Sequence, residues 1–404
     1  MDTRTQLRDR LRQSRDWTAT IDELEKEAEH LGTKPEQSDR LFELASLVED
    51  VIPERERALG LYQRAWKLHP DNLKALSRAR EVYAEIGRFE MVAKLGEMEL
   101  RSPAAANDLA RIVGEALLDS GQKDKALLVL QRAAGNEPQS IRVRDALAAV
   151  TYDPESWADA VDLLSDEADT KDEPTAIRML LRAARIQRLE NPEDKDGRLE
   201  ELVKRILAKD IDEPSANFLF ETLLAQTNRW DELEAHHKRR ADRSGDHAKR
   251  VDALRTFGLE WVQRFKDRDR GAKFFDAALK ATASNGTSTM RSVVAAFSLL
   301  RQVYGERNEW LPILDVADAL LDKLPDSEDR LFVAVQAGQI AFDKANDLSR
   351  ARRYFAAAAR IAPTNPSVQD FMAAIGLEPD AIAAGSMPMP AVKEEPSAPA
   401  APRP

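Results

Sequence analysis

The sequence predicts an all-α protein built as an α-solenoid, in which pairs of antiparallel helices stack one upon the next. The first observation is a recurring pattern of a small residue, a bulky residue, a second small residue and a proline. It occurs at Ala58, Tyr62, Ala65 and Pro70, returns two steps of 34 residues later at Ala126, Leu130, Ala133 and Pro138, and returns again at Ala351, Phe355, Ala358 and Pro363. The second observation is that the 404 residues are 32% charged and 43% hydrophobic with only 16 glycines, as is typical of long amphipathic helices. Units that repeat in this way bury their apolar faces against their neighbours, which predicts one continuous array.

Each repeat is expected to contain two helices, as the unit from residue 107 to 140 illustrates. Two apolar stripes at helical spacing run through Leu109, Ile112, Val113, Ala116 and Leu117, and then through Ala126, Leu127, Leu130 and Ala133. Ser120 and Gly121 separate the stripes, and Pro138 prevents the second helix from continuing into the next unit. The small side chain of Gly114 is expected to let the two helices of the pair approach closely.

Ten helical pairs are predicted, counted by the residue that stands early in each second helix. These positions are Thr20, Ala58, Val92, Ala126, Ala160, Glu201, Glu234, Gly271, Ile313 and Ala351. The pattern is strongest over residues 39–174 and 294–363. It is weakest over residues 175–246, where Glu201 and Glu234 replace the expected small residue, so repeats there are expected to be degenerate.

With these units the chain resembles the tetratricopeptide repeat (TPR) family over about nine tenths of its length. The resemblance implies a right-handed superhelix whose first helices line a concave groove, with a long trough left free for another protein. Such arrays serve unrelated assemblies, so the resemblance specifies the fold and leaves the function open. The alanine- and arginine-rich, cysteine-free composition favours a bacterial source.

The solenoid is expected to span residues 1–377 and to end in a capping helix at 366–377. Ser367 is predicted to cap the first turn of this helix, while Phe371 and Met372 cover the exposed end of the core. The segment 378–404 is rich in proline and alanine and buries too little apolar surface to order itself, which predicts a disordered tail.

Composition also narrows the classes of function. With no cysteine the chain has no thiolate nucleophile and no cysteine-ligated metal, and a reducing compartment suits it. The net charge of −11 argues against general nucleic-acid binding. No apolar stretch approaches the length that spans a bilayer, and no glycine-rich phosphate loop or nucleophile motif occurs. We therefore expect a cytoplasmic, non-catalytic protein with no cofactor.

The only cluster of histidines is His236, His237 and His247. Adjacent residues on a helix point about 100° apart, so His236 and His237 cannot both face one metal ion. These residues are interpreted as surface histidines on a basic helix, and no metal site is predicted.

The groove that the resemblance implies would present acidic residues in the early units and apolar residues in the middle units. These residues are Glu43, Asp50, Glu81, Glu115, Asp145, Met179 and Leu219. Such a groove suits a basic or amphipathic peptide or partner helix, so the first hypothesis is a protein-interaction scaffold or adaptor. The same residues fit ordinary solvated helix faces, and self-association is a further possibility.

A second hypothesis rests on residues 238–273, which hold twelve Lys and Arg against six Asp and Glu, a net charge of +6. Lys238, Arg239, Arg240 and Arg243 stand close together at its start. A regulator could contact an acidic partner or a nucleic-acid backbone through this segment. The alternative interpretation is a solvated helix end with neighbouring ion pairs.

Overall fold

The computed structural model describes residues 3–12, 17–51, 55–243, 245–285, 290–325 and 327–375. These residues form helices that are joined by turns, bends and short irregular segments, and none of them lies in a β-strand. The first nine helices are α1 (Thr3–Arg12), α2 (Trp17–Glu29), α3 (Lys34–Val51), α4 (Arg55–Leu68), α5 (Leu73–Glu85), α6 (Phe89–Glu99), α7 (Leu109–Asp119), α8 (Lys123–Asn136) and α9 (Ile141–Ala148). The others are α10 (Trp157–Ala168), α11 (Glu173–Glu190), α12 (Arg198–Lys209), α13 (Pro214–Gln226), α14 (Trp230–Arg243), α15 (His247–Gln263), α16 (Arg268–Asn285), α17 (Met290–Glu306), α18 (Trp310–Leu321), α19 (Glu328–Asp343), α20 (Leu348–Ile361) and α21 (Pro366–Ala374). The prediction of an all-α solenoid is confirmed.

The helices pack in consecutive pairs, as the repeat pattern predicts. In the pair α7 and α8, Ala126, Leu130 and Ala133 are fully buried. Gly114 of α7 lies so close to Leu130 that an added Cβ atom would stand 2.5 Å from Leu130 Cδ2. The close approach expected from the small residue is therefore present.

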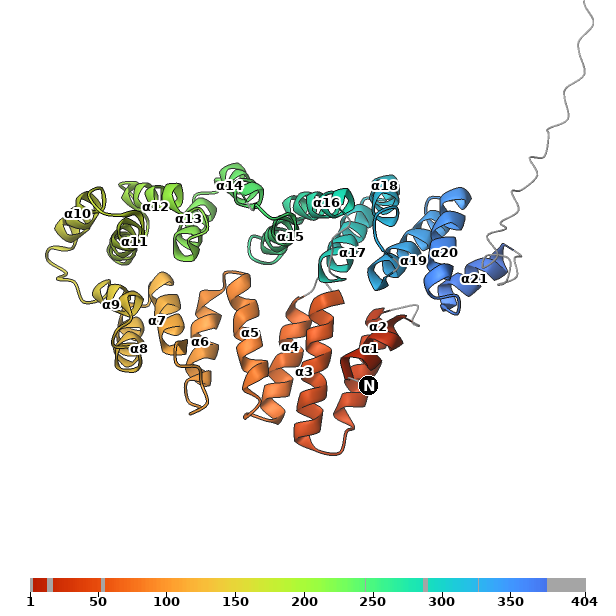
Figure 1. Ribbon diagram of the computed structural model, residues 1–404, viewed down its shortest axis with the longest axis horizontal. Helices are drawn as coiled ribbons and strands as arrows, with labels where there is room; N and C mark the ends of the chain where they lie inside the picture. The colour runs from red at the N-terminus through yellow and green to blue at the C-terminus, as the bar shows by residue number, and fades with distance from the viewer. Residues whose placement is uncertain are drawn as a thin grey trace, which may run out of the picture.

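The array folds back on itself. Helices α1 to α9 form one row, the chain turns between α9 and α10, and α10 to α21 return as a second row opposite the first (Figure 1). Contacts between α3 and α17, between α7 and α13 and between α9 and α11 join the rows. The rings of Phe89 and Phe218 meet across the rows, with their centroids 4.3 Å apart.

Among the described residues, the buried apolar side chains form three cores, and the largest of them joins the two rows. One apolar core combines side chains of α1 to α5 with side chains of α15 to α21, for example Leu44 and Phe297. Two further cores lie within the second row and within α6 to α9. The trough that is free for another protein is therefore shorter than expected, because the first row packs against the second over part of the array. A repeat pattern describes contacts between neighbouring units and contains no information on this long-range packing.

The weakly matching stretch from residue 175 to 246 forms most of α11 and all of α12, α13 and α14. Glu234, which replaces a small residue there, is only 9% exposed. Its carboxylate accepts hydrogen bonds from Lys238 at 2.6 Å and from Arg270 at 3.1 Å. Two cations thus compensate the burial of this carboxylate.

The closing helix α21 begins at Pro366, and its first turn is capped by Asn365 instead of Ser367. The Asn365 side-chain oxygen accepts a hydrogen bond from the Ser367 backbone N–H at 3.0 Å, whereas the Ser367 hydroxyl accepts one from Gln339. Pro366 fits the first helical position because its missing N–H has no partner there in any helix. Phe371 and Met372 are each 3% exposed in the first core. The predicted tail lies outside the described residues.

Replacing Asn365 with alanine is expected to lower the free energy of unfolding by about 1 kcal/mol, because the cap of α21 is lost. Asn365→Ser should retain most of the stability, since serine caps a helix equally well. Urea denaturation followed by circular dichroism measures both variants. An alanine variant as stable as the wild type would contradict this assignment of the cap.

No helix among the described residues is both long enough and apolar enough to cross a membrane.

Candidate functional site

A cleft of about 680 Å³ lies between α7 and α9 of the first row and α11 to α13 of the second row. We call it the bend cleft. It is lined by Glu115, Arg142, Asp145, Glu173, Pro174, Ile177, Arg178, Leu181, Arg182, Arg185, Lys209, Asp210, Glu213 and Pro214. Most of these residues belong to α7, α9, α11 and the start of α13, so the fold-back itself creates the cleft.

A buried polar network beside the bend cleft joins three helices from the two rows. Arg185 of α11 donates to Asp119 of α7 with an Nε to Oδ1 distance of 2.8 Å. The Ser215 hydroxyl of α13 donates to the other Asp119 oxygen at 2.7 Å, and Arg185 donates to that hydroxyl at 3.0 Å. Arg185 and Asp119 are each 4% exposed. Burial lowers the pKa of Arg185, but attraction and hydrogen bonding to Asp119 outweigh it, so the net pKa is raised and the guanidinium stays charged.

Two acidic residues predicted from the sequence line the bend cleft, and both already have basic partners. Glu115 lies 3.0 Å from Arg111 and 3.2 Å from Arg142. Asp145 lies 3.5 Å from Arg178. The acidic groove expected from the sequence is therefore largely neutralised at this point, because arginines from the same and neighbouring helices reach its carboxylates.

The wall that α11 contributes combines apolar and basic groups. Ile177 and Leu181 stand one helical turn apart, as do Arg178 and Arg182. The Arg182 Nε atom is buried and has no hydrogen-bond partner among the described residues. This wall offers apolar contact next to an unsatisfied donor.

The other groove residues predicted from the sequence are not brought to this cleft. Glu81 is exposed and pairs with Arg78 at 2.9 Å, and Glu43 and Met179 are half-buried on α3 and α11. Leu219 is 2% exposed in the core of the second row and presents no surface to a partner. Asp50 lies near the end of α3, and its side chain is outside the described part of the chain.

Of the four basic residues predicted as a patch, two form ion pairs with glutamates and two are exposed. Lys238 lies 2.6 Å from Glu234, and Arg240 lies 2.9 Å from Glu221. Arg239 and Arg243 are exposed on α14. Because half of these cations are already compensated, the arrangement favours a solvated helix with neighbouring ion pairs over a continuous basic surface.

His236 and His237 are buried, which corrects their interpretation as surface residues. They are 2% and 0% exposed. Since adjacent residues point about 100° apart on a helix, each histidine reaches a different neighbour. His236 Nε2 lies 2.7 Å from Asn217 of α13, while His237 stacks on Phe257 of α15 with the ring planes inclined by 10°.

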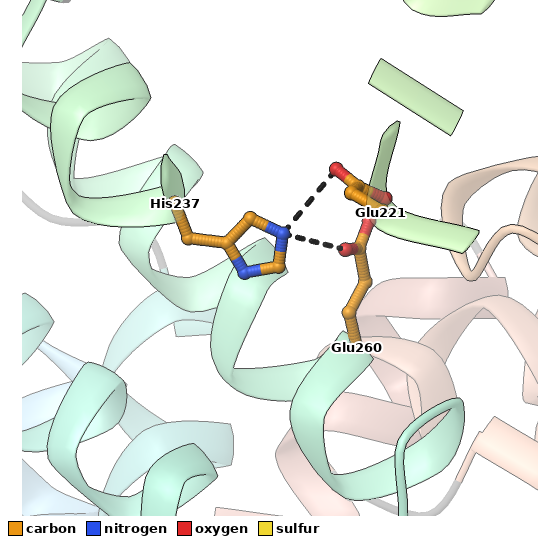
Figure 2. A group of neighbouring side chains, drawn as sticks. All are labelled: Glu221, His237 and Glu260. Carbon is orange, nitrogen blue, oxygen red and sulfur yellow. Dashed lines mark hydrogen bonds and ion pairs between the residues drawn. The ribbon is translucent and has the colours of Figure 1, made fainter. Parts of the chain in front are cut away.

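His237 also belongs to a buried charge cluster with Glu221 and Glu260, contributed by α14, α13 and α15 (Figure 2). Its Nε2 atom lies 3.3 Å from Glu221 and 3.8 Å from Glu260. Glu221 also accepts hydrogen bonds from Arg240 at 2.9 Å and from Arg264 at 2.6 Å. Sequence reasoning did not find this cluster, because its members lie on three different helices.

Burial and charge set distinct protonation states within the cluster. Burial raises the pKa of Glu221, but His237, Arg264 and Arg240 outweigh this effect, so its pKa is lowered and the group is ionised. Burial and repulsion from Glu221 raise the pKa of Glu260 to about 8. Burial lowers the pKa of His237, which is therefore neutral at pH 7.

One ligand atom from each of Glu221, His237 and Glu260 could approach a metal ion, since these atoms lie within 4.8 Å of one another. A divalent cation there would meet the guanidinium groups of Arg240 and Arg264 and would displace a proton from Glu260. The surroundings of the cluster therefore favour a proton over a metal ion.

No protein-family model matches this sequence, and no curated protein matches it at a significant level. Among solved structures, the chain is similar to a chain in the structure of Naa15/Naa10 bound to HypK-THB, with 13% identity and a TM-score of 0.28. That alignment covers 93% of this chain and 62% of the other, so this chain spans less than two thirds of that length. It is also similar to yeast Tom70, with 12% identity, a TM-score of 0.23, and coverage of 89% of this chain and 96% of the other.

Proposed function

We propose that this chain is a non-catalytic protein-interaction scaffold whose bend cleft holds a segment of a partner protein. The observation that carries the proposal is the wall of α11, where Ile177 and Leu181 stand beside the unpartnered Nε atom of Arg182. Apolar side chains of a partner would contact Ile177 and Leu181. A hydrogen-bond acceptor on the partner would pair with the guanidinium group of Arg182.

Charge in the cleft favours an amphipathic segment that carries a carboxylate. A buried donor without a hydrogen bond costs roughly 1–3 kcal/mol, and the Nε atoms of Arg178 and Arg182 are both in this state. Arg182 has no ion-pair partner among the described residues, so an incoming acceptor would benefit it more than Arg178, which lies near Asp145. Glu115 gains less from a basic partner, because Arg111 and Arg142 already pair with it. The Asp145 Oδ2 atom is buried without a hydrogen bond, but it lies 3.5 Å from the cationic Arg178, which limits what a further cation would add. The partner is therefore proposed to be amphipathic and acidic at one point, in place of the basic peptide that the sequence favoured.

The test begins by cross-linking in the native cell, which identifies the partner segment that lies against α11. A synthetic peptide of this segment is then titrated against the chain by fluorescence anisotropy. Leu181→Ser and Arg182→Ala are each expected to weaken binding about tenfold, or about 1.4 kcal/mol.

Leu128→Ser is the matched control, because Leu128 is 69% exposed on α8 and does not line the cleft. It should leave the affinity unchanged. Equal losses in Leu181→Ser and Leu128→Ser, or no loss in either cleft variant, would contradict the proposal.

A further inference from the structure

A second concave surface lies in the first row, away from the bend cleft. It is a groove of about 450 Å³ between α4 and α6, along one side of α5, and we call it the α4–α6 groove. Its lining is mainly apolar and includes the half-buried side chains of Trp66, Tyr83, Met91, Leu95 and Met98. Methionine side chains adapt to differently shaped partners, so two of them in one groove suit an interaction surface.

Gly60 keeps one side of this groove open. It lies inside α4, where glycine is less favourable than alanine, and its φ angle is not in the left-handed region. A Cβ atom added to Gly60 would meet no atom within 4 Å. Neither backbone conformation nor packing within the chain requires glycine here, so the helix surface at Gly60 is open to close approach of a molecule in the groove.

The rim of the groove is basic. Lys67, Arg88 and Lys94 are exposed and line the groove, and none of the three has an ion-pair partner among the described residues. Glu56 is the exposed acid among the lining residues. This excess of free cations stands out on a chain whose net charge is −11. These cations favour a bound molecule that carries acidic groups.

The walls of the groove favour a helix as its occupant. Two helices flank the groove, and the described part of the chain has no strand edge with which an extended peptide could pair. A helix satisfies its own backbone hydrogen bonds and can place apolar side chains at positions i, i+3, i+4 and i+7 in such a groove. We infer that the α4–α6 groove binds an amphipathic helix of a partner protein, with its apolar face on Trp66 and Leu95 and its acidic flanks beside Lys67, Arg88 and Lys94.

A selection experiment on the full chain tests this inference without knowledge of the partner. The probe is a display library of helical peptides of about four turns, with fixed apolar positions at i, i+3, i+4 and i+7 and randomised flanking positions. Selected peptides are expected to be enriched in Asp and Glu at the flanks. Their affinity should fall at least about tenfold in Gly60→Leu, and by a similar factor in the double variant Lys67→Glu/Lys94→Glu.

Gly135→Leu is the control, because Gly135 is also a helical glycine, in the last turn of α8, with no atom within 4 Å of an added Cβ. It should bind the selected peptides as the wild type does. Circular dichroism and thermal melting check that Gly60→Leu remains folded, and Gly60→Ala should raise the unfolding temperature. Leu181→Ser should not affect these peptides, so failure of this inference is distinguishable from failure of the proposed function.

Three results would overturn the inference. The first is selection of peptides with basic flanks, and the second is the absence of any peptide that discriminates wild type from Gly60→Leu. The third is self-association of the chain that disappears in Gly60→Leu, since it would assign the groove to a second copy.

Discussion

Replacing Asp119 with alanine is expected to lower the free energy of unfolding by about 3–5 kcal/mol. The change leaves the Arg185 guanidinium, which is 4% exposed, without its charge partner. It also removes the acceptor of the Ser215 hydroxyl, so α7, α11 and α13 lose their shared polar contact. Urea denaturation followed by circular dichroism and by tryptophan fluorescence measures the loss.

A double variant separates the penalty of an unpaired charge from the net contribution of the pair. Asp119→Leu/Arg185→Met replaces both charges by apolar groups of similar length and should cost much less than Asp119→Ala alone. Asp108 supplies a contrasting case. Its side chain pairs with Arg111 but is half exposed, so water can compensate the loss of this ion pair. Asp108→Ala should therefore change stability by less than about 1 kcal/mol. If Asp119→Ala is no more harmful than Asp108→Ala, the network does not hold the two rows together.

The local part of the fold could be predicted from the sequence because each repeat makes the same contacts with its neighbours. Ala58, Ala126 and Ala351 stand at equivalent positions and are all fully buried. Their burial depends on residues a few turns away and on the adjacent unit. A periodic pattern therefore contains the information needed to place such residues.

The return of the second row could not be predicted in this way. The contacts that create it join residues far apart in sequence, such as Asp119 with Arg185 and Phe89 with Phe218. These pairs share no period with the repeats, and each side chain alone fits an ordinary helix face. The bend cleft depends on the same long-range contacts, so its residues Glu115 and Asp145 could be named while Ile177, Leu181 and Arg182 were missed.

The burial of His237 did leave a signal in the sequence. Leu233, His237 and Ala241 are spaced one turn apart on α14, and the structure buries all three. A histidine between two apolar residues of one stripe predicts a buried ring that needs a polar partner. The sequence does not show which residue is the polar partner, because Glu221 and Glu260 lie on other helices.

Glu260→Gln is expected to abolish a loss of stability that the wild type shows as the pH rises from 6.5 to 8. The pKa of Glu260 is about 8 in the folded chain, against an ordinary value of 4.5. The stability linked to this group is therefore complete below pH 4.5 and declines as the pH rises toward 8, since ionisation is easier in the unfolded chain. Between pH 6.5 and 8 the wild type should lose stability on the order of 2 kcal/mol. Glutamine cannot ionise, so the variant should show no such loss and should be more stable than the wild type at pH 8.

The choice of pH range matters because the buried histidine His236 has the opposite linkage. Burial lowers its pKa from 6.5 to about 3, so its contribution to stability is complete above pH 6.5 and is lost as the pH falls toward 3. Between pH 4.5 and 6.5 the two groups oppose each other, whereas above pH 6.5 the effect of Glu260 remains. Glu201→Gln, the same change at an exposed position of α12, should keep the wild-type pH dependence. Parallel stability curves for the wild type and Glu260→Gln between pH 6.5 and 8 would show that Glu260 is already ionised in the folded chain, and that the cations of Arg240 and Arg264 compensate both carboxylates of the cluster.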